Sequence, residues 1–151
     1  MILPDITTLV PHAVPMLLLD RVVDVDADKL CAQVTIRPDS MFCGEHGVGA
    51  WLGIEYMAQA IAAYAGYHGL QRGEQVKLGF LLGTRRYACE RPWFAVGTSL
   101  YVEVQQLLQA ENGMGSFACT IKECSTQQQL AQATVSVFQP HDESAFLENQ
   151  A

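Results

Sequence analysis

Residues 47–71, near the middle of the chain, constrain the fold more than any other stretch, because they carry a single formally charged side chain, Glu55. Small and apolar residues fill most of the rest, which is typical of a helix covered by protein on nearly all sides. Gln59, His68 and several glycines argue against a membrane span, which needs about 20 predominantly apolar residues. We therefore predict a buried helix at about 49–70 and no membrane segment.

The segments on either side of this helix have the patterns of β-strands. Residues 16–28 and 29–38 precede it and are predicted to form a hairpin across the turn "DADK". In the second arm of this hairpin, alternate apolar residues predict one buried face: Leu30, Ala32, Val34 and Ile36. Four more strands are expected after the helix, with a strong turn at "ENGMG" between the second and third, at about 76–88, 96–108, 114–124 and 129–138.

The order of two strands, one helix and four strands predicts an α+β fold, in which an antiparallel sheet of about six strands wraps around one long central helix. At 151 residues the chain is long enough for one domain, expected over residues 1–138, with a polar tail at 139–151. Asp5 is placed to cap a short helical turn near the N-terminus. Because such a sheet leaves an open edge, pairing with a second chain is expected.

Composition excludes some classes of function. The formal net charge of −7 argues against nucleic-acid binding, which needs basic side chains for the phosphates. The five cysteines are an odd number at irregular spacing, which suits a reducing compartment better than a disulfide framework. The first residues lack the basic and apolar regions of a secretory signal peptide. We therefore expect a cytoplasmic protein.

Glu55 is the first candidate for chemistry. An ionised carboxylate is costly in apolar surroundings, so burial favours the neutral acid, which can give a proton to a leaving group. Gln59 lies one turn further along the helix, where it can hydrogen bond Glu55 or a substrate. His46, on the glycine-rich approach "CGEHGVG", is a candidate base. Backbone N–H groups where the helix starts, near Gly49, can stabilise a carbonyl oxygen that gains negative charge. Together these groups fit elimination of water from a β-hydroxy carbonyl compound.

Simpler interpretations of the same residues stay open. Glu55 can pair with an arginine or face solvent, and His46 can be an ordinary loop histidine. Cys43 and His46 have the CxxH spacing of half a zinc site, but no second ligand pair accompanies them. A Cys–His nucleophile pair has no more support, because adjacency in sequence does not activate a thiol. We expect no metal, nucleotide or flavin cofactor, since the sequence lacks a phosphate-loop glycine pattern and a ligand cluster.

Two blocks of the sequence resemble the β-hydroxyacyl-(acyl carrier protein) dehydratases of the hotdog fold. The block "LVPHAVPMLLLDRVVDVD" is similar to their N-terminal signature, with matches at Pro11, His12, Pro15, Leu17–Leu19, Asp20 and Arg21. The block "FCGEHGVGAWLGIEYMAQ" is similar to their active-site signature, with matches at Phe42, Gly44, His46, Glu55, Met57, Ala58 and Gln59. The loop between the histidine and the helix is shorter than the family's, which resembles a divergent branch associated with aryl-polyene and related type II polyketide clusters.

This resemblance implies a hotdog fold and a hydro-lyase that converts a 3-hydroxyacyl thioester to the trans-2-enoyl thioester, in fatty-acid or polyketide synthesis. His46 matches the family's base and Glu55 its acid, and the two meet across the interface of a homodimer or a hotdog heterodimer. Ala50 falls where a family glycine offers its backbone N–H to the thioester oxygen. Two alternatives remain: a hotdog acyl thioesterase that activates water, and a weakly catalytic partner subunit of a heterodimeric dehydratase.

Three arginines lie close together after the central helix, Arg85, Arg86 and Arg91. Arginine binds phosphate groups in a bidentate manner. If the substrate is attached to phosphopantetheine, this patch can bind its phosphate or an acidic acyl carrier protein, which the net charge of −7 otherwise repels. The alternative is a solvated patch paired with Glu90.

Overall fold

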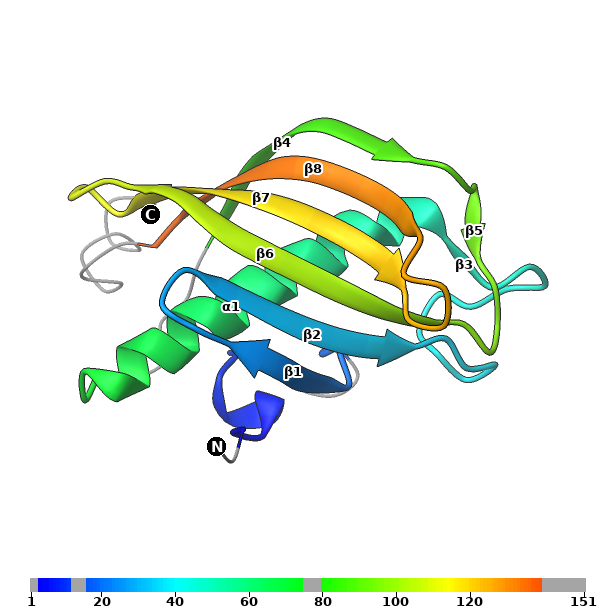
Figure 1. Ribbon diagram of the computed structural model, residues 1–151, viewed down its shortest axis with the longest axis horizontal. Coiled ribbons are helices and arrows are strands. Elements are labelled where there is room, and N and C mark those ends of the chain that lie inside the picture. Colours follow the sequence, from blue (N-terminus) through cyan, green and yellow to red (C-terminus); the bar gives the residue numbers. More distant parts are fainter. Residues whose placement is uncertain (1–2, 12–15, 75–79, 140–151) are drawn as a thin grey trace, which may run out of the picture.

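The computed structural model of the chain describes residues 3–11, 16–74 and 80–139 (Figure 1). Three sets of residues named above lie outside these ranges: His12 and Pro15 of the N-terminal signature, residues 76–79 of the strand expected at 76–88, and residues 140–151 of the polar tail. In the part of the chain that is described, no helix is both long enough and apolar enough to span a membrane.

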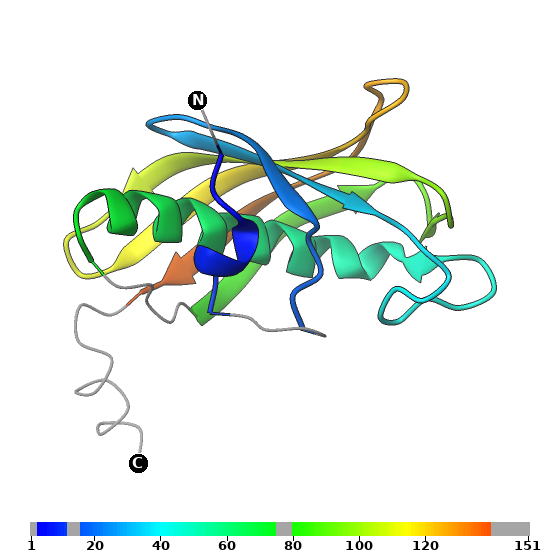
Figure 2. The same ribbon diagram turned by 90° about the horizontal axis from the view of Figure 1, so that it is seen from below.

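The described elements follow the predicted order. They are η1 (Ile6–Thr8), β1 (Arg21–Val25), β2 (Lys29–Thr35), β3 (Val48–Gly49), η2 (Ala50–Leu52), α1 (Gly53–Gln71), β4 (Phe80–Cys89), β5 (Trp93–Phe94), β6 (Ser99–Gln109), β7 (Met114–Glu123) and β8 (Gln129–Phe138). Six of the strands form one sheet in the order β1-β2-β6-β7-β8-β4, with every neighbouring pair antiparallel. Figures 1 and 2 show this sheet curving around α1. The predicted α+β architecture is confirmed.

The alternate apolar residues of the second predicted strand are buried on one face of the sheet, as predicted. Leu30, Ala32 and Val34 of β2 are buried, and each faces an apolar partner of β6 across the ladder. These partners, Val104, Val102 and Leu100, have no exposed surface. A side-chain period of two therefore gives the sheet one apolar face, which packs on α1.

Two very short strands, β3 and β5, were not predicted. They pair antiparallel, Val48 with Phe94 and Gly49 with Trp93. β3 comes shortly before α1 in the chain, whereas β5 follows β4. A strand of two residues has no alternation to recognise, because its pairing depends on a partner far along the chain. The pair fixes the segment that leads into the central helix.

The N-terminal segment covers part of the face of α1 that the sheet leaves open (Figure 2). Asp5 accepts a hydrogen bond from the N–H of Thr7 at 2.9 Å, which confirms the predicted cap of this turn. At Gly66, a Cβ atom would lie 1.9 Å from the backbone oxygen of Leu9. Only glycine at this position allows the two backbones to approach so closely.

Strand β4 forms an edge of the sheet, since among the described strands it pairs with β8 alone. Its register shifts between Arg85 and Ala88, and Arg86 has a positive φ of 55°, as in a β-bulge. Beside this irregularity, the Tyr87 hydroxyl donates a hydrogen bond to the carbonyl of Ala50. The edge strand is thereby tied to η2, the short helical turn that precedes α1.

Candidate active site

Glu55 lies half-buried in the first turn of α1, and its carboxylate is held by the side chain of Gln59. Gln59 Nε2 donates to Glu55 Oε1 at 3.0 Å and to the backbone oxygen of Met16 at 2.8 Å. Its Oε1 accepts from the N–H of Leu18 at 2.8 Å. The predicted contact between Gln59 and Glu55 is confirmed.

The predicted contact of Gln59 with a substrate is not what the structure indicates. The side chain has no exposed surface, and both of its amide hydrogens are used within the chain. Its three partners come from α1 and from the segment before β1, so this one amide joins two parts of the fold. Gln59 therefore holds the Glu55 carboxylate in place, and its side chain has no surface open to a ligand in this structure.

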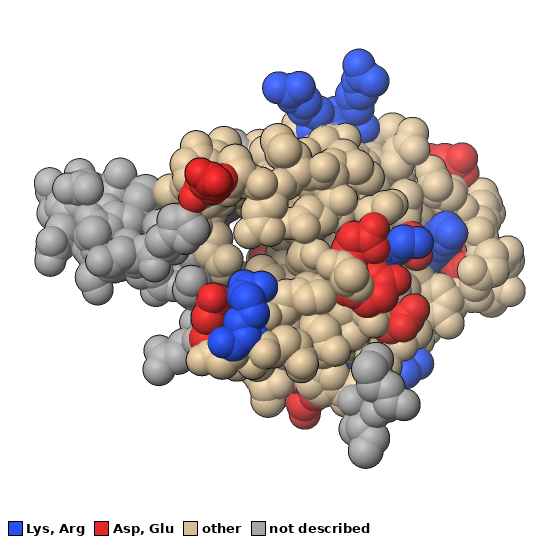
Figure 3. All heavy atoms as spheres, turned by 60° about the vertical axis from the view of Figure 1, so that its left-hand side comes forward, with Lys and Arg blue, Asp and Glu red and all other residues tan. Residues whose placement is uncertain are grey.

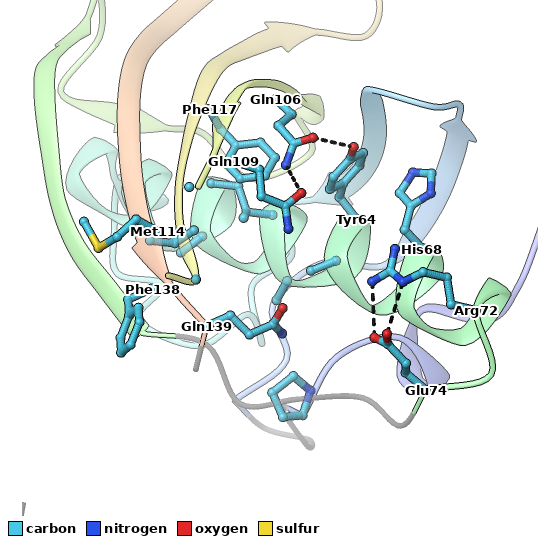
Figure 4. A pocket seen from close by; sticks show the side chains of 18 of the residues that line it. Tyr64, His68, Arg72, Glu74, Gln106, Gln109, Met114, Phe117, Phe138 and Gln139 are labelled. Atoms are coloured by element: carbon cyan, nitrogen blue, oxygen red, sulfur yellow. Dashed lines mark hydrogen bonds and ion pairs between the residues drawn. The ribbon is translucent and has the colours of Figure 1, made fainter. Parts of the chain in front are cut away.

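Glu55 lines one large cavity of about 690 Å³, a size typical of small-molecule sites. Small side chains at a spacing of three or four residues form its helical wall: Ala58, Ala62 and Ala65. The ends of β6, β7 and β8 form the opposite wall. Figure 4 shows several of the polar and aromatic side chains that line this cavity, among them Tyr64, Gln106 and Phe117. A half-buried carboxylate at the side of a cavity lined by both apolar and polar side chains is suited to proton transfer to a bound ligand.

His46 lies elsewhere, on a tight turn closed by backbone hydrogen bonds between Gly44 and Gly47. Gly47 has a φ of +110°, and a Cβ atom there would lie 2.1 Å from the oxygen of Phe94. The His46 side chain is exposed, and the centre of its ring lies 5.4 Å from that of Trp93. His46 does not line the cavity beside Glu55. Among the described residues of one chain, His46 and Glu55 therefore do not line the same cavity.

Exposed aromatic side chains surround this turn. Phe42 and Trp51 pack edge to face, with their ring centres 5.6 Å apart. Together with His46 and Trp93 they form a surface that we call the aromatic corner. Phe42 and Trp51 are 57% and 60% exposed, and Phe42 has a positive φ of 65°. An exposed aromatic cluster of this kind is typical of a site of contact with another molecule.

Ala50 does not offer a free donor. Its N–H donates to the backbone oxygen of Pro92 at 2.9 Å, and its carbonyl accepts from Tyr87. The predicted donation to a thioester oxygen is therefore not available in this structure. The sequence could not reveal this, because Pro92 meets Ala50 only through the pairing of β3 with β5.

The three clustered arginines differ in whether they have an ion-pair partner. Arg91 pairs with Glu123 at 3.5 Å, and not with Glu90 as the simpler interpretation held. Arg85 and Arg86 are exposed on β4 and have no ion-pair partner among the described residues. Figure 3 shows some basic side chains lying against acidic ones and others standing apart from them.

Metal and thiol chemistry find little support in the described residues. No group of three or more His, Cys, Asp or Glu side chains there is placed to hold a metal ion. Burial raises the pKa of Cys119 to about 12, and burial together with nearby Glu103 raises that of Cys31 to about 12. These two thiols stay protonated at neutral pH and are poor nucleophiles.

The sequence and fold are similar to those of known proteins. The family model described as ApeP-like, ApeP dehydratase, matches residues 4–148. A chain in the structure of the dehydratase heterocomplex ApeI:P from Xenorhabdus doucetiae is 32% identical; the match covers 96% of this chain and 96% of that one, with a TM-score of 0.88. No curated protein matches the sequence.

More distant structures share the fold alone. The PaaI protein from the phenylacetic acid degradation operon of E. coli is 16% identical over 78% of this chain and 80% of that one, with a TM-score of 0.61. Zebra fish thioesterase superfamily member 2 is 10% identical over 80% of each chain, with a TM-score of 0.57. The predicted hotdog fold is confirmed.

Proposed function

The chain belongs to the ApeP-like dehydratase family, hydro-lyases of the aryl-polyene type, and we propose that Glu55 is the acid of its reaction. The single observation that carries this proposal is the Glu55 carboxylate, held by buried Gln59 at the side of a cavity of about 690 Å³. A group fixed in this way is oriented toward a ligand in the cavity before the ligand arrives.

The proposed substrate is a 3-hydroxyacyl thioester. A base removes the proton from C2, and the electron pair of that C–H bond forms the new C2–C3 double bond. The C3–O bond breaks at the same time, and the departing hydroxyl takes a proton from Glu55 and leaves as water. The products are the trans-2-enoyl thioester and one water molecule, and neither oxidant nor reductant is needed.

We propose His46 as the base, acting on a substrate held beside the helix carboxylate of a partner subunit. Its exposed position on the turn at Gly44–Gly47, outside the cavity of its own chain, supports a role between subunits. The open edge of β4 and the aromatic corner are surfaces through which a second hotdog chain can pair with this one. The Xenorhabdus relative belongs to a heterocomplex, which favours a partner of different sequence.

The experiment that tests the function is dehydration of a 3-hydroxyacyl carrier-protein thioester, followed by mass spectrometry as the loss of water. The chain is assayed alone and with a candidate hotdog partner, and native mass spectrometry gives the assembly in each sample. Activity in either sample supports the dehydratase. Activity that needs the partner identifies a heterodimeric enzyme. Inactivity in both, on carrier-bound and on free thioesters, would contradict the proposal.

We further propose that Arg85 and Arg86 bind the acyl carrier protein or the phosphate of its phosphopantetheine. They are exposed and lack ion-pair partners among the described residues, so their charges are available to an acidic ligand. The double variant Arg85→Glu/Arg86→Glu is expected to raise KM for the carrier-bound substrate by about tenfold or more. The KM for a pantetheine thioester, which has no phosphate, is expected to stay the same.

A phosphopantetheine thioester separates the two parts of this proposal. A rise in KM for it indicates phosphate binding, and a rise for the carrier protein alone indicates a protein contact. Lys29→Glu, an exposed charge reversal on β2, is the matched control and is expected to have little effect. Equal KM values for wild type and double variant on all three substrates would leave the arginines without this role.

A further inference from the structure

Tyr87 connects the edge strand β4 to the start of the central helix, close to Glu55. Figure 1 shows β4 running along the edge of the sheet toward the end at which α1 begins. The Tyr87 side chain is half-buried and packs against the hydrophobic core. Its hydroxyl donates a hydrogen bond to the carbonyl of Ala50, the first residue of η2. Two elements that are far apart in the sequence are therefore joined within a few residues of the proposed acid.

The irregularity of β4 turns the Tyr87 side chain inward. Between Arg85 and Ala88, which both pair with β8, β4 has one more residue than β8. The extra residue reverses the alternation of the strand, so that Arg85 and Arg86 are both exposed and Tyr87 is half-buried. In a regular strand Tyr87 would lie on the same face as Arg85. The bulge thus gives Tyr87 its contact with the start of the helix.

Gly53, the first residue of α1, leaves the space that the Tyr87 hydroxyl needs. A Cβ atom at Gly53 would lie 2.3 Å from the hydroxyl oxygen and 3.0 Å from Ile121 Cδ1. The backbone of Gly53 is helical, with a φ of −56° and a ψ of −32°, so its conformation does not require glycine. Glycine is also a poorer helix former than alanine. The close approach of the Tyr87 side chain accounts for glycine at this position.

The carbonyl oxygen of Ala50 is the point at which the strand and the helix meet. It accepts from the Gly53 N–H, where α1 begins, and from the Tyr87 hydroxyl, and its two lone pairs can serve both. Burial, together with the nearby Cys89 thiol, raises the pKa of Tyr87, so its hydroxyl stays a donor at neutral pH. The N–H of Ala50 donates to the Pro92 oxygen at 2.9 Å. Both backbone groups of Ala50 are therefore held from outside η2.

Glu55 follows Gly53 by two residues, which corresponds to about 3 Å along the axis of α1. The carboxylate of Glu55 is held by Gln59. The backbone that carries this carboxylate is held by Tyr87 through the Ala50 carbonyl. A shift of about 1 Å in a reacting group can lower a rate about 100-fold. An anchor so close to the proposed acid can therefore affect the reaction without touching the substrate.

We propose that Tyr87 is a positioning residue for the reaction, which fixes the first turn of α1 and thereby the Glu55 carboxylate. This inference rests on the proposed function, because it assumes that Glu55 is the acid. Tyr87 does not line the cavity beside Glu55. It therefore acts through the Ala50 carbonyl and the helix backbone, and not by contact with the substrate.

The test compares Tyr87→Phe with wild type in the dehydration assay, with the partner chain if activity needs it. Phenylalanine keeps the ring and removes the hydroxyl that anchors the helix start. The kcat is expected to fall about tenfold, while KM changes by less than about twofold. Tyr101→Phe removes a hydroxyl from β6, outside the cavity, and is the matched control with unchanged kcat. An active wild type with unchanged kcat in Tyr87→Phe would overturn the inference and leave the dehydratase in place.

Two double variants separate positioning from a general loss of stability. Gly53→Ala puts a methyl group against the Tyr87 hydroxyl and suits a helix, so it is expected to lower kcat about as much as Tyr87→Phe. Since both changes act on one hydrogen bond, Gly53→Ala/Tyr87→Phe is expected to be no slower than the slower single variant. In the Glu55→Gln background, Tyr87→Phe is expected to lower the residual rate no further. Losses that multiply in either double variant would contradict a role through Glu55.

Hydrogen exchange separates a failure of this inference from a failure of the proposed function. Amide exchange in the peptide that covers residues 50–56 is followed by mass spectrometry, without any substrate. It is expected to be about fivefold faster in Tyr87→Phe than in wild type, and unchanged in Tyr101→Phe. Faster exchange together with an inactive wild type would support Tyr87 as the anchor of the helix start and contradict the dehydratase. Unchanged exchange in Tyr87→Phe would overturn the inference whatever the activity.

Discussion

Replacing Glu55 by glutamine is expected to lower kcat for dehydration by about 10²–10⁴-fold, the usual contribution of a general acid. The amide has the size of the carboxyl group. Its oxygen can still accept a hydrogen bond from Gln59 Nε2, which lies 3.0 Å from Glu55 Oε1 in the wild-type chain. It cannot give a proton to the departing hydroxyl. The fold and the affinity for substrate are therefore expected to change little, and the loss to appear in kcat more than in KM.

The measurement is a steady-state assay of the active enzyme, with circular dichroism as the check of folding. Glu103→Gln is the control, because Glu103 lies on β6 away from the cavity. Unchanged kcat in Glu55→Gln would show that the acid is a different group. Loss of activity together with loss of structure would instead assign Glu55 to stability.

Replacing Gln59 by leucine is expected to lower the free energy of unfolding by about 2–4 kcal/mol. Leucine cannot accept the hydrogen bond from the Leu18 N–H or donate one to the Met16 carbonyl. These two backbone groups then lose their partner at a position where the Gln59 side chain has no exposed surface. Glu55 also loses a hydrogen bond, so kcat is expected to fall in the protein that remains folded. Urea unfolding followed by circular dichroism measures the first effect.

Gln33 provides a matched control for this substitution. Its Oε1 is buried and has no hydrogen-bond partner among the described residues, so Gln33→Leu removes no acceptor that a neighbour uses. Its free energy of unfolding is expected to stay within about 1 kcal/mol of wild type or to rise. An equal loss in both variants would indicate that the hydrogen bonds of Gln59 contribute little to stability.

The fold could be predicted from the sequence wherever the type of each residue indicates whether its position is buried or exposed. The alternation of β2 and the uncharged stretch around Glu55 correctly predicted one strand face and the central helix. Periodicity reflects burial along a single element, and this information is local in the sequence. The pairing of β3 with β5 is not local, and it was missed.

The site was predictable in its residues more than in its contacts. Glu55 was correctly placed in the central helix, with Gln59 as its neighbour. The other partners of Gln59, more than 40 residues away at Met16 and Leu18, follow only from the tertiary fold. The hydrogen bond from the Ala50 N–H to the Pro92 oxygen likewise follows only from the tertiary fold. The polar lining of the cavity also draws on strands far from the helix, and no local pattern marks it.

The aromatic corner has a consequence for spectroscopy. The chain has two tryptophans, Trp51 and Trp93, and both lie in this corner, 60% and 45% exposed. Their emission in the folded chain is therefore that of largely hydrated indole rings, and unfolding shifts its colour little. A molecule that covers the corner removes water from both rings and moves the emission to shorter wavelength. Intrinsic fluorescence thus reports on the approach of a second molecule far better than on unfolding.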